Sequence, residues 1–203
     1  MARSGSSRML VLLTIAAFAA RSVFYPTTVF AGSRMPALQP STRPGCGRII
    51  AYVSEGDSLP SVDVDVSKPG DTVNVADLFK GKKGILFAVP GAFTPTCSEK
   101  HLPGYIEQAD ELKKAGAEVV ACVSVNDPFV MSSWGKEQGA EGKVQMLADT
   151  KCELTKALDM ELDATAKLGN VRSQRYAMII DDGVVKKVYK DDDSFAPEVI
   201  KGL

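Results

Sequence analysis

A short stretch in the middle of the chain carries the residues best suited to redox chemistry. Cys97 follows an apolar run, Ile85 to Val89, and precedes residues whose apolar positions recur with helical spacing. We expect Cys97 at the start of a helix, where unpaired backbone N–H groups and the helix dipole favour the thiolate over the thiol. Thr94 can bring a hydroxyl to the same pocket and donate it to the thiolate. The stretch therefore predicts a nucleophilic cysteine; the alternative is an inert, buried one.

His101 follows Cys97 by four residues, so the two side chains share one face of the expected helix. An imidazole there can stabilise a thiolate, or it can ligate a metal together with Cys97. The chain offers no second pair of ligands at a suitable spacing, so we predict no metal site. We expect His101 to be a packing residue or one that supports the site from behind the cysteine.

Several motifs, in a consistent order, resemble those of one enzyme family. The run Pro90-Gly91-Ala92-Phe93-Thr94-Pro95-Thr96-Cys97-Ser98 resembles the peroxidatic-cysteine loop of the peroxiredoxins, and His101-Leu102-Pro103-Gly104-Tyr105 narrows the resemblance to type II. It continues through residues 124–130, Trp134-Gly135, residues 175–178 and Asp182-Gly183, and so spans roughly residues 50 to 203. The resemblance implies a redoxin domain of the peroxiredoxin-5-like group. It also implies a thiol-dependent peroxidase without a cofactor, which reduces hydrogen peroxide and alkyl hydroperoxides through a sulfenic acid at Cys97.

The same resemblance implies roles for other residues. Cys97 would be the attacking thiolate, with Thr94 as a hydroxyl donor and Pro90 as a shield against water. Arg175, before a late apolar run, matches the arginine that supplies a cation to the thiolate. The neighbouring basic residues Arg172 and Lys167 are alternatives for that role.

The sulfenic acid must then be resolved by a second thiol. The C-terminal region has no cysteine, whereas Cys122 lies 25 residues after Cys97, a spacing found in type II enzymes served by glutaredoxin or glutathione. Yet Cys122 lies inside the apolar run 119–125, which predicts a buried strand and a core side chain. Cys152 is a weaker candidate. We therefore expect resolution by an external thiol. The resemblance favours glutaredoxin or glutathione over thioredoxin as its source. We also expect a homodimer.

Two other classes of protein share the fold that this resemblance implies. A dithiol oxidoreductase would need Cys-x-x-Cys, but Thr94 occupies the position three residues before Cys97. A redox-regulated binding module without catalytic turnover would not need Thr94 or Arg175. The net charge of −1 gives no electrostatic basis for nucleic-acid binding.

The N-terminal part of the chain has a different composition from the rest. Residues 1–54 contain six arginines and no Asp, Glu or Lys. Residues 1–20 resemble a signal peptide, with a twelve-residue apolar run that is short for a bilayer, and residues 21–48 resemble a transit peptide. We predict a cleaved bipartite leader and a plastid location, with a mitochondrial or secretory route as alternatives and no membrane anchor in the mature protein.

Residues 49–203 are expected to form one peroxidase domain. Buried strands are expected at 85–89, 118–125 and 144–148, a fourth at 175–180 with a hairpin at Asp182-Gly183, and helices from Cys97 to about Ala115 and from Cys152 to Leu162. Alternation of strands and helices before a hairpin predicts an α/β fold with a mixed central sheet flanked by helices. Together with the resemblance, this implies a thioredoxin-like fold.

Overall fold

A mixed, seven-stranded sheet forms the centre of the computed structural model, which describes residues 53–203. The predicted leader, residues 1–48, and Cys46 lie outside the described residues. In the order β2-β1-β5-β4-β3-β8-β9, the strands are Thr72–Asn74, Asp63–Asp65, Gln145–Ala148, Val119–Ser124, Lys83–Ala88, Tyr176–Asp181 and Val184–Lys190. The central strands β3, β4 and β5 are parallel, and β8 is antiparallel to β3. The predicted mixed sheet, its buried strands and the hairpin between β8 and β9 are confirmed.

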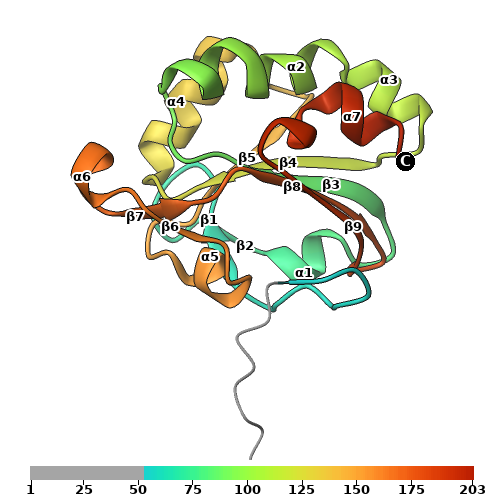
Figure 1. The fold of residues 1–203 in the computed structure, drawn as a ribbon, viewed down its shortest axis with the longest axis horizontal. Coiled ribbons are helices and arrows are strands. Elements are labelled where there is room, and N and C mark those ends of the chain that lie inside the picture. Colours follow the sequence, from blue (N-terminus) through green and yellow to red (C-terminus); the bar gives the residue numbers. More distant parts are fainter. Residues whose placement is uncertain (1–52) are drawn as a thin grey trace, which may run out of the picture. The chain divides into compact units, whose positions relative to one another are not determined.

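Helices cover both faces of this sheet (Figure 1). One face carries α2 (Leu102–Glu107), α3 (Ala109–Lys114), α4 (Pro128–Gln138) and α7 (Ala196–Ile200); the other carries α1 (Val75–Leu78) and α5 (Glu153–Ala157). Asp127 caps α4 through its carboxylate, which accepts from two backbone N–H groups, as the Asn-Asp-Pro sequence predicts. None of the helices between residues 53 and 203 is long and apolar enough to cross a membrane.

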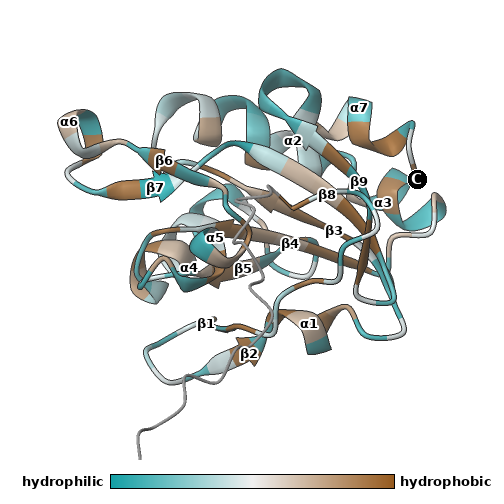
Figure 2. Ribbon diagram, turned by 60° about the horizontal axis from the view of Figure 1, so that its bottom comes forward, coloured by the Kyte–Doolittle hydropathy of each residue, from teal (hydrophilic) through white to brown (hydrophobic). Residues whose placement is uncertain are grey.

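Alternation along the buried strands divides the core between the two faces. Phe87 and Cys122 belong to the cluster beneath α2 and α4, together with Cys97. Their neighbours Leu86 and Ala121 belong to the cluster on the α1 and α5 side. Figure 2 shows apolar residues along these central strands. The side chain of Cys122 therefore projects from the same face of the sheet that the helix of Cys97 covers.

Two sequence-based expectations about helices were wrong. Residues 152–162 are not one helix: α5 ends at Ala157, and Glu161–Asp163 forms β6, which pairs with β7 (Val171–Ser173) around the short helix α6 (Thr165–Leu168). Asp159 adopts a left-handed backbone, which stops the helix, and the pairing with β7 then outweighs local helical propensity.

The helix after Cys97 is also less regular than expected. Residues Cys97–His101 form a π-helical turn, in which the N–H of Leu102 donates to the carbonyl of Cys97. Pro103 lies in the first turn of α2, directly after this π-helical turn. The break falls at Gln108, between α2 and α3.

Candidate active site

Cys97 is the first residue of the π-helical turn and follows closely the loop that leaves β3. The helical backbone begins at Pro95, so Cys97 lies near the N-terminal end of the helix, as predicted, and it is fully buried. The loop is held against the end of β4, because the N–H of Ala92 donates to Asn126 Oδ1 over 3.1 Å. Ser124 Oγ donates to the same oxygen and thereby fixes the amide. The neighbouring strand thus holds the loop that leads to Cys97.

Arg175, which is distant from Cys97 in the sequence, contacts its sulfur. Its Nη2 donates to Cys97 Sγ over 3.3 Å. The register explains the placement: Tyr176, the first residue of β8, pairs with Ala88, the last residue of β3, so Arg175 lies beside the exit of β3. Arg175 also has the same parity as Ala177, which faces the helix of Cys97. The alternation and the register together aim the guanidinium at the thiol.

His101 holds the other end of the same guanidinium. Arg175 Nη1 donates to His101 Nδ1 over 2.8 Å, and His101 Nε2 lies 3.1 Å from the carbonyl of Ser194. Burial, and then the positive charge of Arg175, lower the pKa of His101 to about 3, although the bond to Ser194 acts in the opposite direction. The imidazole is therefore neutral, and its Nδ1 lone pair accepts from the guanidinium. His101 thus contacts the guanidinium that in turn contacts the sulfur of Cys97.

Two further residues that the sequence assigns to the site lie in the loop before Cys97. Pro90 and Thr94 are half-buried in the loop before Cys97. The hydroxyl of Thr94 donates to the carbonyl of Gly91 over 2.9 Å, rather than to Cys97 as we expected. This bond closes the loop. Because a hydroxyl has a single hydrogen to donate, Thr94 can donate to an oxygen beside Cys97 only if it gives up its bond to Gly91.

The two alternative cations do not contact Cys97. Arg172 donates to the carbonyls of Val125 and Leu168, so its guanidinium ties β7 to the end of β4. Lys167 is exposed in α6. Of the basic residues considered, Arg175 is the one that the described structure places on the sulfur.

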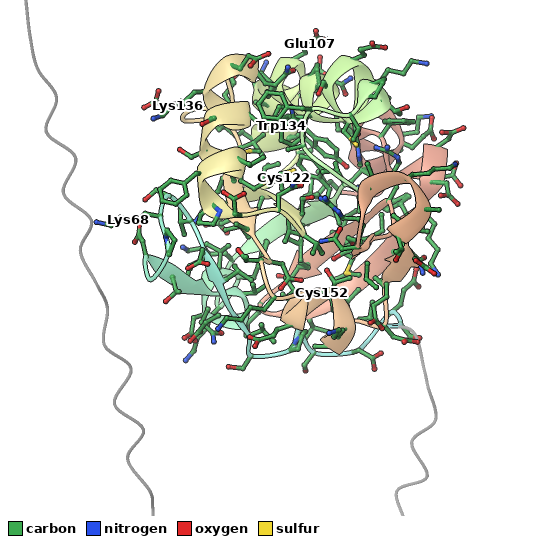
Figure 3. The ribbon with its side chains drawn as sticks, turned by 90° about the vertical axis from the view of Figure 1, so that its left-hand side faces the viewer. Lys68, Glu107, Cys122, Trp134, Lys136 and Cys152 are labelled. Atoms are coloured by element: carbon green, nitrogen blue, oxygen red, sulfur yellow. The ribbon has the colours of Figure 1, made fainter. Side chains whose placement is uncertain are left out.

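The other described cysteines, Cys122 and Cys152, are free and buried. Cys122 lies in mid-strand between Phe87 and Met146, and Figure 3 shows it in the interior near Trp134. Burial, and then the neighbouring Cys97, raise the pKa of Cys122 well above its ordinary value, although Arg175 acts in the opposite direction. Burial raises the pKa of Cys152 as well. Both groups are thiols at neutral pH and poor nucleophiles.

Sequence reasoning did not find the residues that support His101. Ser194 belongs to the 3₁₀ turn Asp191–Ser194 and provides the carbonyl beside His101 Nε2. Tyr105 Oη donates to the same carbonyl over 2.7 Å. Phe195 places its ring edge-on to the imidazole, 5.1 Å between centroids. These contacts join segments about ninety residues apart, so no local sequence pattern predicts them.

Comparisons with known proteins agree with the fold. The family model "Redoxin" matches residues 54–199. The chain is 48% identical over 168 residues to the chloroplastic peroxiredoxin-2E-2 of Oryza sativa, covering 76% of this chain and 74% of the relative. It is 47% identical to the chloroplastic peroxiredoxin-2E of Arabidopsis thaliana, covering 76% and 71%.

Solved structures give the same result. Reduced Prx3 of Vibrio vulnificus in complex with H₂O₂ matches with a TM-score of 0.70 and 47% identity, covering 74% of this chain and 99% of that one. Peroxiredoxin 5 of Alvinella pompejana matches with a TM-score of 0.70 and 43% identity, covering 73% and 96%. The chain belongs to the redoxin family, and within it to the type II peroxiredoxins, which are thiol peroxidases of thioredoxin-like fold.

The state of His101 can be tested directly, because the chain contains a single histidine. We expect its imidazole NMR signals to show no titration between about pH 8 and pH 5. The unfolded chain takes up a proton near the ordinary pKa of 6.5, whereas the folded chain does so only near 3. Stability is therefore lost as the pH falls below 6.5, by about 2 kcal/mol between pH 7 and pH 5 from this group.

Chemical denaturation at the two pH values measures that loss, and His101→Gln serves as the control that lacks it. An imidazole that titrates near its ordinary pKa would contradict the buried, neutral histidine.

Proposed function

We propose that Cys97 is the nucleophile of this thiol peroxidase and that Arg175 is the cation that stabilises its thiolate. The observation that carries the proposal is the 3.3 Å contact between Arg175 Nη2 and Cys97 Sγ in a buried setting. A thiolate without a partner would be costly to bury, whereas a guanidinium in hydrogen-bonding contact favours the charged form. In this proposal, the contact with Arg175 makes Cys97 the reactive thiol of the domain.

The reaction joins the sulfur to one peroxide oxygen. The thiolate of Cys97 attacks the terminal oxygen of ROOH, the S–O bond forms, and the O–O bond breaks. The oxygen that leaves carries the electron pair as RO⁻ and takes a proton to become an alcohol or water. Cys97 is then a sulfenic acid, and two external thiols return it to the thiol while they form a disulfide and release water.

Other loop residues have supporting roles in this proposal. Pro90 shields the sulfur from water, and the Thr94 hydroxyl turns from the carbonyl of Gly91 toward the bound peroxide oxygen. His101 keeps the guanidinium in place and contributes no charge. No cofactor takes part in this scheme.

Cys97→Ser should abolish peroxide reduction, because a serine hydroxyl neither ionises at neutral pH nor forms a sulfenic acid. The assay follows consumption of hydrogen peroxide and of an alkyl hydroperoxide by the mature domain with glutathione and glutaredoxin. Cys152→Ser is the matched control and should turn over like the wild type, since Cys152 directly precedes α5, far along the chain from the loop of Cys97. A Cys97→Ser variant that reduces peroxide near the native rate would refute the assignment. A wild-type domain that consumes no peroxide would instead favour a redox-regulated binding module.

We further propose that an external thiol, from glutathione or glutaredoxin rather than thioredoxin, resolves the sulfenic acid at Cys97. Two observations on Cys122 support resolution by an external thiol. Its thiol is buried in the middle of β4, and its raised pKa keeps it protonated. A bridge between Cys97 and Cys122 would also need facing Cβ atoms about 3.5–4.5 Å apart, which the helix of Cys97 could offer only by opening locally.

Cys122→Ser should therefore keep turnover with glutathione and glutaredoxin within about twofold of the wild type, an allowance for a buried substitution. Mass spectrometry of the protein after one equivalent of hydrogen peroxide and thiol trapping should show Cys97 as the oxidised residue and Cys122 as a free thiol. A dominant bridge between Cys97 and Cys122, together with loss of turnover in Cys122→Ser, would overturn this route.

We propose that the protein acts in a plastid. The composition of residues 1–48 supports this, as do two relatives whose names include "chloroplastic". The protein isolated from its native source should begin between about Ala20 and Arg48. N-terminal peptide mapping of the organelle fraction measures this start. Peptides from residues 1–8 in that fraction would contradict cleavage.

We also propose that the mature protein is a homodimer. In the described part of the chain, the exposed large apolar residues are Phe93, Phe129, Leu162 and Val171. Phe93 precedes Cys97, and Leu162 and Val171 belong to the hairpin that Arg172 ties to the end of β4, so apolar surface gathers near the site. Analytical sedimentation of the wild type and of Phe129→Asp measures the oligomeric state of each. A monomeric wild type at micromolar concentration would contradict the homodimer.

A further inference from the structure

The carbonyl oxygen of Ser194 accepts hydrogen bonds from two buried side chains. Tyr105 Oη donates to it over 2.7 Å, and His101 Nε2 lies 3.1 Å away. Tyr105, His101 and Ser194 are each fully inaccessible to solvent. Tyr105 stacks on Phe87 of β3, with 3.9 Å between ring centroids and 7° between planes. Two helical side chains thus meet the C-terminal turn at one backbone oxygen, and one of them, Tyr105, also packs on β3.

This carbonyl decides which nitrogen of His101 carries the proton. A carbonyl can only accept, so Nε2 must carry the hydrogen that points to Ser194. The lone pair of Nδ1 then faces the guanidinium and accepts from Arg175 Nη1. The guanidinium is held in this way with Nη2 directed at Cys97 Sγ. The orientation of the cation beside the sulfur therefore depends on the position of the Ser194 carbonyl.

The same turn also holds Arg175 by other contacts. The N–H of Asp191 donates to the backbone carbonyl of Arg175 over 3.1 Å. Phe195, directly after the turn, lies with its ring centroid 6.0 Å from the guanidinium carbon. Ser194 Oγ donates to the carbonyl of Asp191 over 2.5 Å and closes the turn on itself. The turn thus touches the backbone of Arg175 and the imidazole that supports it, and Phe195, the next residue, lies over the Arg175 side chain.

We infer that the turn Asp191–Ser194 is a positioning element for the Arg175 guanidinium, and that Ser194 is the residue through which it acts. Its carbonyl sets the tautomer of His101, and its hydroxyl keeps that carbonyl in place. Tyr105 is the second anchor of the same oxygen. The inference rests on the proposed function, in which Arg175 is the cation of the Cys97 thiolate.

The experiment compares Ser194→Ala with Ser173→Ala in the mature domain. Both serines are fully buried, and both hydroxyls donate to a backbone carbonyl, but that of Ser173 donates to Gln174, outside the turn. Thiolate absorbance against pH and the rate of Cys97 oxidation by hydrogen peroxide are the readouts. We expect Ser194→Ala to move the thiolate titration to higher pH and to slow oxidation about 2- to 10-fold, the value of one hydrogen bond. Ser173→Ala should behave as the wild type in both.

Tyr105→Phe gives a graded version of the same test. It removes one of the two donors to the carbonyl and should act in the same direction with a smaller effect, since His101 remains bound. Tyr176→Phe is its control, because the buried hydroxyl of Tyr176 belongs to the core cluster on the opposite face of the sheet and does not donate to Ser194. Thermal unfolding of each variant separates a loss of stability from a change at the sulfur. A lower melting temperature with an unchanged thiolate titration in both Ser194→Ala and Tyr105→Phe would overturn the inference.

Each variant is then repeated in the Arg175→Ala background. The effect of Ser194→Ala on oxidation should disappear there, because the guanidinium that the turn positions is gone. An effect of the same size in both backgrounds would refute action through Arg175. If Arg175→Ala itself left the thiolate titration unchanged, the proposed role of Arg175 would fail, and this outcome differs from a failure of Ser194 alone.

Should Ser194→Ala not fold, the wild type still tests the idea through its single imidazole. Long-range ¹H–¹⁵N NMR identifies the protonated nitrogen. Protonation on Nε2 supports the arrangement, and protonation on Nδ1 would overturn it.

Discussion

The contact between Arg175 and Cys97 is the interaction on which the rest of the site depends. Cys97 is fully buried, and a buried thiolate is stable only when a fixed positive charge or hydrogen-bond donors replace the water it has lost. A guanidinium suits this role because it stays charged at any relevant pH and offers several donors in one rigid plane. Nη2 of the guanidinium donates to the sulfur and Nη1 donates to His101, so the cation has little freedom to turn away.

The sheet brings the two partners together from distant parts of the chain. Cys97 follows β3, and Arg175 precedes β8, which runs antiparallel beside β3. The end of one strand therefore lies next to the start of the other, and the alternation of side chains directs Arg175 toward the helix of Cys97. A shift of this pairing by one residue would turn the guanidinium to the opposite face. The same alternation places Cys122 beneath the helix, near the sulfur yet enclosed by Phe87 and Met146.

The π-helical turn at Cys97–His101 affects both the fold and the site. It widens the helix at the residues that carry the sulfur and the imidazole, just before Pro103 begins the regular helix α2. His101 is thereby buried against Phe87 and Phe195 and bonded at both ring nitrogens. Its loss of basicity follows from burial and from the adjacent guanidinium, so a residue that usually senses pH acts here as a neutral acceptor.

Local patterns in the sequence determined much of this protein. The apolar runs predicted the central strands, the Asn-Asp-Pro sequence predicted the start of α4, and the motif around Cys97 placed the thiol near a helix start. These features depend on residues a few positions apart, which is the range over which periodicity and capping act. The short strands β6 and β7 were missed because their pairing, not their own propensity, makes them strands.

Only the tertiary structure decided how the site is assembled. It selected Arg175 over Arg172, because strand register sends one guanidinium to the sulfur and the other to the carbonyl of Val125. It also brought the carbonyl of Ser194 to His101 and Tyr105 across about ninety residues of sequence. A backbone carbonyl has no side-chain identity, so nothing in the amino-acid sequence can mark it as a partner until the chain has folded around it.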